Sequence, residues 1–146
     1  VYRVSHWLHV RGWRRSAGFL RRVNFFVHKI DLSPQSCIGP GAMIPHPVSV
    51  AFHGRAGQGL TIYAGGICTT HASAPVGRAD SGPTLGDRVT VGSCAVLLGP
   101  ITIGDDVKIG YTVIVERDIP ARMLVIARTM KPAKTMPVSP PEVSHG

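Results

Sequence analysis

The hydrophobic positions of this chain recur every six residues from Ile38 onward. A first series with this spacing is apolar throughout, namely Ile38, Ile44, Val50, Ala56, Ile62 and Cys68. A second series, in a different phase, comprises Leu85, Val91, Leu97, Ile103, Ile109 and Val115. Smaller apolar residues follow four positions behind the second series: Val89, Ala95, Ile101, Val107, Val113 and Ile119. This period fits neither an amphipathic helix nor a hairpin sheet; it is typical of a hexapeptide β-helix.

Such a repeat predicts a mainly β fold in which each hexapeptide supplies one short strand and one corner. Three repeats make one triangular coil, whose apolar residues point inward and stack on those of the next coil. Coils of this kind carry left-handed crossovers, an exception to the usual right-handed rule. We therefore predict a left-handed parallel β-helix rather than a right-handed solenoid or a β-sandwich. Glycine follows the apolar residue in several repeats, where we expect a tight turn to need its flexible backbone: Gly39, Gly86, Gly92, Gly104 and Gly110.

The segments outside the repeats divide the chain into three parts. Residues 1–30 are predicted to form a helical N-terminal segment, broken near Gly12 into two short helices, because apolar residues recur there near helical spacing. The β-helix domain is expected over residues 31–126. The polar, Gly- and Pro-rich stretch 69–84 interrupts its phase and is interpreted as a protruding functional loop. Residues 127–146 are expected to be a basic segment that ends in a disordered tail.

Composition agrees with one domain in a reducing compartment. The 146 residues are 44% hydrophobic, which excludes a disordered chain. The three cysteines, Cys37, Cys68 and Cys94, form no Cys-x-x-Cys pair and argue against a disulfide framework or a structural zinc site. No secretory signal and no apolar run of membrane-spanning length is visible, so we expect a cytoplasmic protein. The chain does not begin with Met, and its N-terminus is expected to be incomplete.

The net charge of +8 is concentrated in two clusters. Seven Arg and Lys residues precede the first acidic residue, Asp31. The second cluster comprises Arg117, Arg122, Arg128, Lys131 and Lys134. Such clusters suggest an anionic partner, although a solvated basic face would have the same composition. We expect no nucleic acid partner. Peripheral membrane contact through the basic N-terminal helices is one interpretation, and packing of their aromatic residues against the following domain is another.

Five stretches of the chain carry a family resemblance. They are VSHWLHVRG (4–12), DLSPQSCIGPGAMIPH (31–46), IPHPVSV (44–50), GLTIY (59–63) and PTLGDRVTVGSCAVLLGPITIGDDVKIG (83–110). Together they resemble the serine O-acetyltransferases, which are hexapeptide-repeat acyltransferases, over roughly residues 3–134. The version IPHPVSV is similar to that of related enzymes that acetylate surface polysaccharides. The pairing of Asp31 with His46 is the discriminating part, because hexapeptides alone are shared by many acyltransferases.

The resemblance implies an acetyl-CoA-dependent O-acetyltransferase without a metal. His46 matches the family's general base, since an imidazole can take a proton from an acceptor hydroxyl and return one to the CoA thiolate. Asp31 matches the carboxylate that orients this ring. The family binds acetyl-CoA in a groove between the β-helices of a homotrimer, so the active sites are expected between subunits. The matching positions are Ser93, Ala95, Gly110 and Tyr111, with Arg128, Lys131 and Lys134 expected to attract the phosphates.

The sequence departs from the family at several of these positions. Tyr111 stands where a small residue is usual, and the family's C-terminal Gly-Val-Pro-Ala turn reads Ala127-Arg128-Thr129-Met130. The family's Asp-Arg-His-Pro run at the end of the loop reads Asp80-Ser81-Gly82-Pro83. The Arg and His that grip serine are therefore absent unless Arg78 or His71 replaces them; with Asp80, these two are the expected substrate-binding residues. This change favours a sugar or glycan hydroxyl as acceptor, whereas the overall likeness favours serine.

Two other functions remain as alternatives. A catalytically degenerate β-helix that serves as a scaffold or regulatory subunit is supported by Tyr111 and by the altered C-terminal turn. A zinc-dependent hydratase would use His46, His53 and His71 as ligands, since γ-type carbonic anhydrases place three His on a similar β-helix. The spacing of the three histidines does not match that pattern, which makes the hydratase the weakest of the three interpretations.

Overall fold

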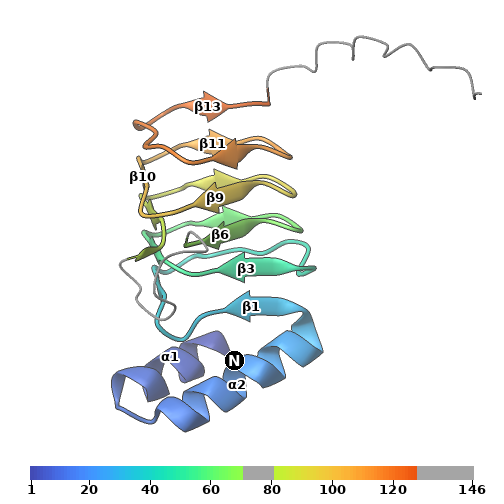
Figure 1. The fold of residues 1–146 in the computed structure, drawn as a ribbon, viewed down its shortest axis with the longest axis vertical. Coiled ribbons are helices and arrows are strands. Elements are labelled where there is room, and N and C mark those ends of the chain that lie inside the picture. The colour runs from blue at the N-terminus through green and yellow to red at the C-terminus, as the bar shows by residue number, and fades with distance from the viewer. Residues whose placement is uncertain (71–80, 128–146) are drawn as a thin grey trace, which may run out of the picture.

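The protein is a parallel β-helix with two helices at its N-terminal end (Figure 1). The structure, a computed structural model, describes residues 1–70 and 81–127. Within these ranges the helices are α1 (Tyr2–Val10) and α2 (Arg14–His28). The middle of the predicted loop and nearly all of the predicted C-terminal segment lie outside the described residues.

Thirteen short strands in the described ranges form three parallel sheets. Sheet A contains β1 (Ile30–Leu32), β3 (Val50–Phe52), β6 (Ile67–Thr69), β9 (Val96–Leu98) and β12 (Ile114–Val115). Sheet B contains β2 (Cys37–Ile38), β4 (Arg55–Ala56), β7 (Thr84–Leu85) and β10 (Thr102–Ile103). Sheet C contains β5 (Thr61–Ile62), β8 (Thr90–Val91), β11 (Lys108–Ile109) and β13 (Leu124–Val125). The chain passes through the three sheet positions in turn, with isolated bridges in place of strands at Met43, which pairs with Thr61 of sheet C, and at Ile119, which pairs with Ile103 of sheet B. Each circuit adds one coil.

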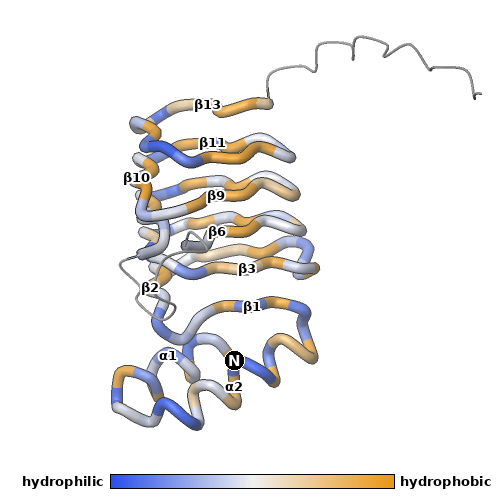
Figure 2. The backbone as a smooth tube through the Cα atoms, viewed as in Figure 1, coloured by the Kyte–Doolittle hydropathy of each residue, from blue (hydrophilic) through white to orange (hydrophobic). Residues whose placement is uncertain are grey.

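The core is the column of residues that the six-residue period predicted. In sheet B, for example, Ile38 lies in register with Ala56, and Ala56 with Leu85. All six residues of the second series are buried, and of the first series only Ile44 and Ala56 are partly exposed. Figure 2 shows apolar segments recurring in successive coils. The prediction of a mainly β, left-handed parallel β-helix after a short helical segment is thereby confirmed.

The reason given above for the repeated glycines is wrong. Left-handed backbone occurs instead two residues after the glycine, as at Cys94 (φ 56°) after Gly92 and at Thr112 (φ 54°) after Gly110. A Cβ on Gly92 would lie 2.6 Å from the carbonyl carbon of Gly110 in the next coil. A Cβ on Gly39 would lie 2.4 Å from the Gly57 carbonyl oxygen. Glycine is required at Gly39, Gly86, Gly92 and Gly104 because successive coils approach too closely for a side chain, whereas Gly110 has more space.

The two helices cover the first coil. The Ser5 hydroxyl donates to the Ala17 carbonyl at 2.9 Å, which joins α1 to α2 where both residues are buried. The Asn24 amide donates to the Ile30 carbonyl at 3.2 Å and so ties α2 to the start of β1. Helix α2 ends at Lys29, whose left-handed conformation (φ 56°) turns the chain into sheet A. None of the described helices is both long enough and apolar enough to cross a membrane.

Candidate active site

The outer surface of sheet A has two edges that organise the candidate site. Because all strands of the sheet are parallel, the residues that precede them share one edge and the residues that follow them share the other. We call the first the leading edge; it consists of the turns at residues 45–49, 64–65, 93–94 and 111–112. We call the second the trailing edge; it consists of residues 53–54, 69–70, 98–99 and 116–117.

The leading edge brings His46 into line with two predicted CoA-binding residues. Backbone hydrogen bonds connect its turns from coil to coil: Gly65 N–H to Val48 O at 2.8 Å, Cys94 N–H to Ala64 O at 2.9 Å, and Thr112 N–H to Ser93 O at 2.9 Å. The side chains of His46, Ser93 and Tyr111 are all exposed along this edge. The predicted general base and two residues predicted to bind the CoA arm therefore lie on one surface of the same chain.

The predicted CoA-binding residues differ in what they can offer a ligand. Ser93 is small and exposed, so there is room beside it for an extended thiol arm. Tyr111, directly after it on the edge, is 74% exposed and stands where the family has a small residue. Gly110 donates its N–H to Val125 O at 2.7 Å. Ala95 is fully buried, and its N–H and carbonyl bond to Gly92 and Ile67, so it packs in the core and does not line a groove of this chain.

Asp31, the middle residue of β1, lines a cavity of about 450 Å³ together with residues of the trailing edge. Its neighbour in the sheet is Ala51, on β3. The cavity opens between α2 and the trailing edge, and its lining includes His9, Arg14, Arg21, Asp31, His53, Thr69 and Thr70. Thr69 and Thr70 are the first residues of the predicted loop, so the cavity borders the start of that segment.

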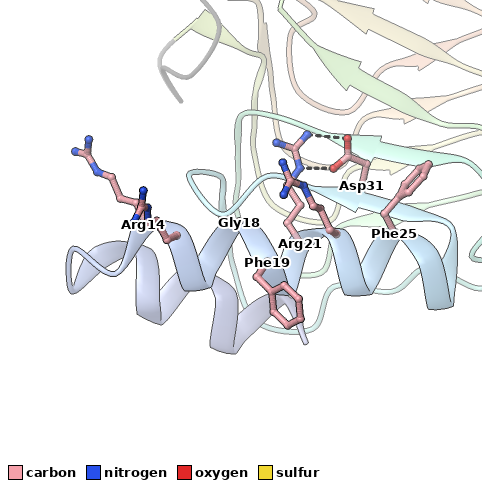
Figure 3. Close-up of a pocket in the computed structure, with 8 residues that line it drawn as sticks. Arg14, Gly18, Phe19, Arg21, Phe25 and Asp31 are labelled. Atoms are coloured by element: carbon pink, nitrogen blue, oxygen red, sulfur yellow. Dashed lines mark hydrogen bonds and ion pairs between the residues drawn. The ribbon is translucent and has the colours of Figure 1, made fainter.

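Asp31 forms an ion pair with Arg21 of α2 (Figure 3). The guanidinium binds both carboxylate oxygens, Nε to Oδ1 at 2.5 Å and Nη2 to Oδ2 at 2.7 Å. These hydrogen bonds raise the pKa of Arg21 above its ordinary value. No hydrogen bond between described residues joins Asp31 to His46. The predicted pairing of carboxylate and imidazole is therefore not made in the single chain, although each carboxylate oxygen keeps a lone pair that could accept one.

Two arginines of α2 are functional candidates that the sequence analysis named only as part of a basic cluster. Arg21 anchors Asp31, and Arg14 lines the same cavity with a guanidinium that makes no ion pair or hydrogen bond to the described residues. A second hollow of about 700 Å³, outside the first, is lined by Arg14, Arg15, Gly18, Phe19, Arg21, Arg22, Phe25 and Asp31. The sequence signal was a helix with four arginines nine to seventeen residues before a candidate carboxylate, but the side of the helix that faces the carboxylate depends on tertiary packing.

The remaining predicted site residues cannot be placed. His71, Arg78 and Asp80, as well as Arg128, Lys131 and Lys134, lie outside the described residues. Gly82 is described, and it is buried. A Cβ there would lie 1.9 Å from the His53 carbonyl oxygen. A histidine in the family's position at the end of the loop would therefore not fit this backbone.

The described residues contain no group of three His, Cys, Asp or Glu side chains that could hold a metal ion. Of the three histidines considered for zinc, His46 lies at the leading edge and His53 at the trailing edge, whereas His71 is outside the described ranges. The arrangement of His46 and His53 gives no support to a shared metal.

The chain was compared with known proteins. No family model matches it. It is 35% identical to the serine acetyltransferase of Helicobacter pylori over 89% of this chain and 75% of that protein. It is 35% identical to the serine acetyltransferase of Mycobacterium tuberculosis over 86% of this chain, but spans only 54% of that protein. The solved structure of Neisseria gonorrhoeae serine acetyltransferase in complex with serine superposes with a TM-score of 0.79 at 30% identity, covering 90% of this chain and 53% of that one. Taken with the β-helix and its exposed His46, these likenesses show that the chain belongs to the serine acetyltransferase family of acyltransferases.

Proposed function

We propose that this chain transfers an acetyl group from acetyl-CoA to the hydroxyl of serine, with His46 as the general base. The observation that carries the proposal is the leading edge, which exposes His46 on the same surface as Ser93. The imidazole would accept the proton of the acceptor hydroxyl and return a proton to the departing CoA sulfur. The relatives with this fold are named for serine acetylation, and one of them has been solved with serine bound.

Asp31 is proposed to orient and stabilise the imidazolium. The bidentate contact with Arg21 holds the carboxylate in a fixed position. An anchored carboxylate loses less conformational freedom when it accepts a further hydrogen bond, so it is suited to fix the tautomer of a catalytic ring. In this proposal Arg21 is a positioning residue that acts through Asp31.

A trimer would bring the two edges of neighbouring sheets together. The outer face of sheet A is apolar beyond Asp31, with Ala51, Ile67, Val96 and Ile114 in register. The corresponding outer positions of sheet B are polar or small: Cys37, Arg55, Thr84 and Thr102. Packing the apolar face against a neighbouring copy would bury it and close the groove beside His46. We therefore propose a homotrimer whose active sites lie between subunits.

The structure limits how this chain could bind the carboxylate of serine. Serine brings a carboxylate, and the backbone at Gly82 leaves no space for the histidine that grips it in the family. Arg14 is the cavity's cation without a described partner, so it is the proposed substitute. If Arg14 does not serve this purpose, a sugar hydroxyl, which needs no cation, is the second candidate.

The test is CoA release from acetyl-CoA with L-serine and with a panel of sugars offered separately. We expect His46→Ala to lower kcat by about a hundredfold to ten-thousandfold, the usual contribution of a general base. His28→Ala is the matched control, because His28 is an exposed histidine in the last turn of α2. Release with serine supports the main proposal, and release only with sugars supports the second candidate. A protein that neither binds acetyl-CoA nor releases CoA would refute both and leave the scaffold interpretation.

A further inference from the structure

The N-terminal helices carry an exposed face that combines aromatic and basic side chains. Helix α2 is buried only along one side, at Ala17 and Asn24, which are seven residues apart. A residue two positions further on lies about 200° around the helix axis. Phe19 and Phe26 occupy these positions and are 65% and 70% exposed. In Figure 3 the ring of Phe19 points away from the strands, whereas Arg21 points toward Asp31 on β1.

Basic residues flank the two phenylalanines on the same face. Arg15 and Arg22 are also seven residues apart and precede Phe19 and Phe26 by four residues, one turn of the helix. Both are exposed. Trp13, the residue immediately before α2, is 66% exposed at the N-terminal end of the helix. The outer face of α2 is therefore made of large rings and guanidinium groups.

The charge of this region is one-sided. Residues 1–30 contain seven Arg and Lys residues and no Asp or Glu. The first acid, Asp31, is neutralised by Arg21. Docking of a second copy through this face would bring like charges together and is therefore disfavoured. A partner that accepts rings and guanidinium groups at once must be anionic at its surface and apolar beneath it, which describes an anionic lipid bilayer.

We propose that the outer face of α2, formed by Arg15, Phe19, Arg22 and Phe26, docks on an anionic membrane surface. The helices lie at one end of the β-helix, beyond β1, while β11 and β13 lie toward the other end (Figure 1). This position lets α2 lie flat on the lipid headgroups without the β-helix in its way. The phenylalanines insert between headgroups and the arginines pair with lipid phosphates. The inference does not depend on which acceptor is acetylated.

The chain provides its own reporter for the test. Trp7 and Trp13 are the two tryptophans of the sequence, and both lie in the helical region. We expect their emission to shift to the blue when the 146-residue chain is titrated with vesicles of phosphatidylcholine mixed with phosphatidylglycerol. No shift is expected with phosphatidylcholine alone, and added salt should reverse the shift. Failure to bind the anionic vesicles, or equal binding to both kinds, would overturn the proposal.

Paired variants separate the two components of the face. Arg15→Gln with Arg22→Gln should weaken vesicle binding about 25-fold, since each basic residue near the surface contributes about fivefold. Phe19→Ser with Phe26→Ser should weaken it by at least about tenfold. The matched control is Lys108→Gln with Arg122→Gln, which removes the same charge from exposed positions on the later coils. Equal losses in the control and the Arg15/Arg22 variant would show that net charge alone is responsible and would refute a docking face.

Two further outcomes would assign the face to another partner. If the face is free in solution, the sedimentation coefficient should not rise with protein concentration. Self-association that disappears in the Phe19/Phe26 variant, in a protein that does not bind vesicles, would identify a second copy of the chain as the occupant. Quenching of the tryptophans by a single-stranded oligonucleotide, again without vesicle binding, would identify a nucleic acid. Either result contradicts the lipid proposal.

Discussion

At the scale of single residues, burial decides which side chains of this chain are available for chemistry. Cys37 and Cys94 are exposed, whereas Cys68 is fully buried in the column of sheet A. Desolvation by burial raises the pKa of the Cys68 thiol to about 12. The thiolate, which is the reactive form, is therefore suppressed at this one position.

This difference predicts the reaction of the protein with a thiol reagent such as Ellman's. Cys37 and Cys94 should react in the native protein, and Cys68 should react only after unfolding. The measurement is the number of thiols titrated before and after addition of denaturant. Rapid reaction of all three thiols under native conditions would mean that the column of sheet A opens readily.

The same burial predicts how stability depends on alkaline pH. The folded state holds the proton of Cys68 more tightly than the unfolded state, whose thiol has an ordinary pKa near 9.0. The stabilisation is thus complete below pH 9 and is lost as the pH rises from 9 to about 12. The free energy of unfolding, measured in urea at several pH values, should fall across this range. Cys68→Ala should flatten that slope even though the cavity it leaves lowers stability at every pH.

Arg14 is the residue on which the choice of acceptor depends. Removal of a charged hydrogen-bond donor to a carboxylate costs about 1.5–3 kcal/mol, so Arg14→Ala should raise the KM for serine at least about tenfold. The KM for acetyl-CoA should stay unchanged. Arg15→Ala is the control, because Arg15 is the adjacent exposed arginine and lines only the outer 700 Å³ hollow, not the 450 Å³ cavity that includes Thr69 and Thr70. An unchanged KM for serine would show that another group binds its carboxylate.

At the scale of the element, the close stacking of coils is the constraint that this fold places on its sequence. Coil corners approach so closely that Gly92 has the backbone of Gly110 and Ile109 within 2.7 Å of where a Cβ would be. Helix α2 imposes no such constraint, because a Cβ on Gly18 would meet nothing within 4 Å. Glycine is thus required in the β-helix and incidental in the helix.

A pair of glycine substitutions tests this difference. Gly92→Ala should destabilise the protein by roughly 1–3 kcal/mol, the usual cost of overpacking. Gly18→Ala should stabilise it by about 0.5–1 kcal/mol, because alanine is the better helix former. The urea midpoint of each variant is the measurement. A harmless Gly92→Ala would mean that the coils can separate locally without cost.

At the scale of the whole molecule, the outer face of sheet A is the surface on which assembly is expected to depend. Ile114 is 66% exposed there, in register with Val96 of the preceding coil. The apolar ridge runs along sheet A, whereas the outer positions of sheet B are polar or small and those of sheet C are polar except at Leu124. This contrast favours a defined interface at sheet A over nonspecific association. The proposed trimer would use this ridge three times.

A single charge should therefore break the assembly. Ile114→Lys is expected to convert the trimer to monomers, because a buried unpaired ammonium is strongly unfavourable. Thr102→Lys places the same charge on the exposed outer face of sheet B and should leave the trimer intact. Molar mass from light scattering during size-exclusion chromatography distinguishes the two results. A wild-type chain that elutes as a monomer would contradict the trimer itself.

The sequence by itself determined the fold, because a six-residue period can be buried in only one way. The six-residue period predicts each buried position of the second series, from Leu85 to Val115. The helices on either side of Gly12 also followed from local patterns, whereas Thr69 and Thr84, the expected ends of the loop, belong to β6 and β7. The buried repeat positions and the two helices depend on neighbours in the sequence or on a repeat, and both can be recognised in the amino-acid sequence alone.

The tertiary structure decided what depends on contacts between distant segments. The role of Gly92 depends on Gly110 in the next coil, which no local pattern reveals. The ion pair between Arg21 and Asp31 depends on which side of α2 faces β1. Ala95, assigned to a ligand by resemblance, is buried because the direction of its side chain is set by the coil. A repeat fixes which residues lie inside, whereas the partner of each outward side chain is fixed only when the coils and helices are assembled in space.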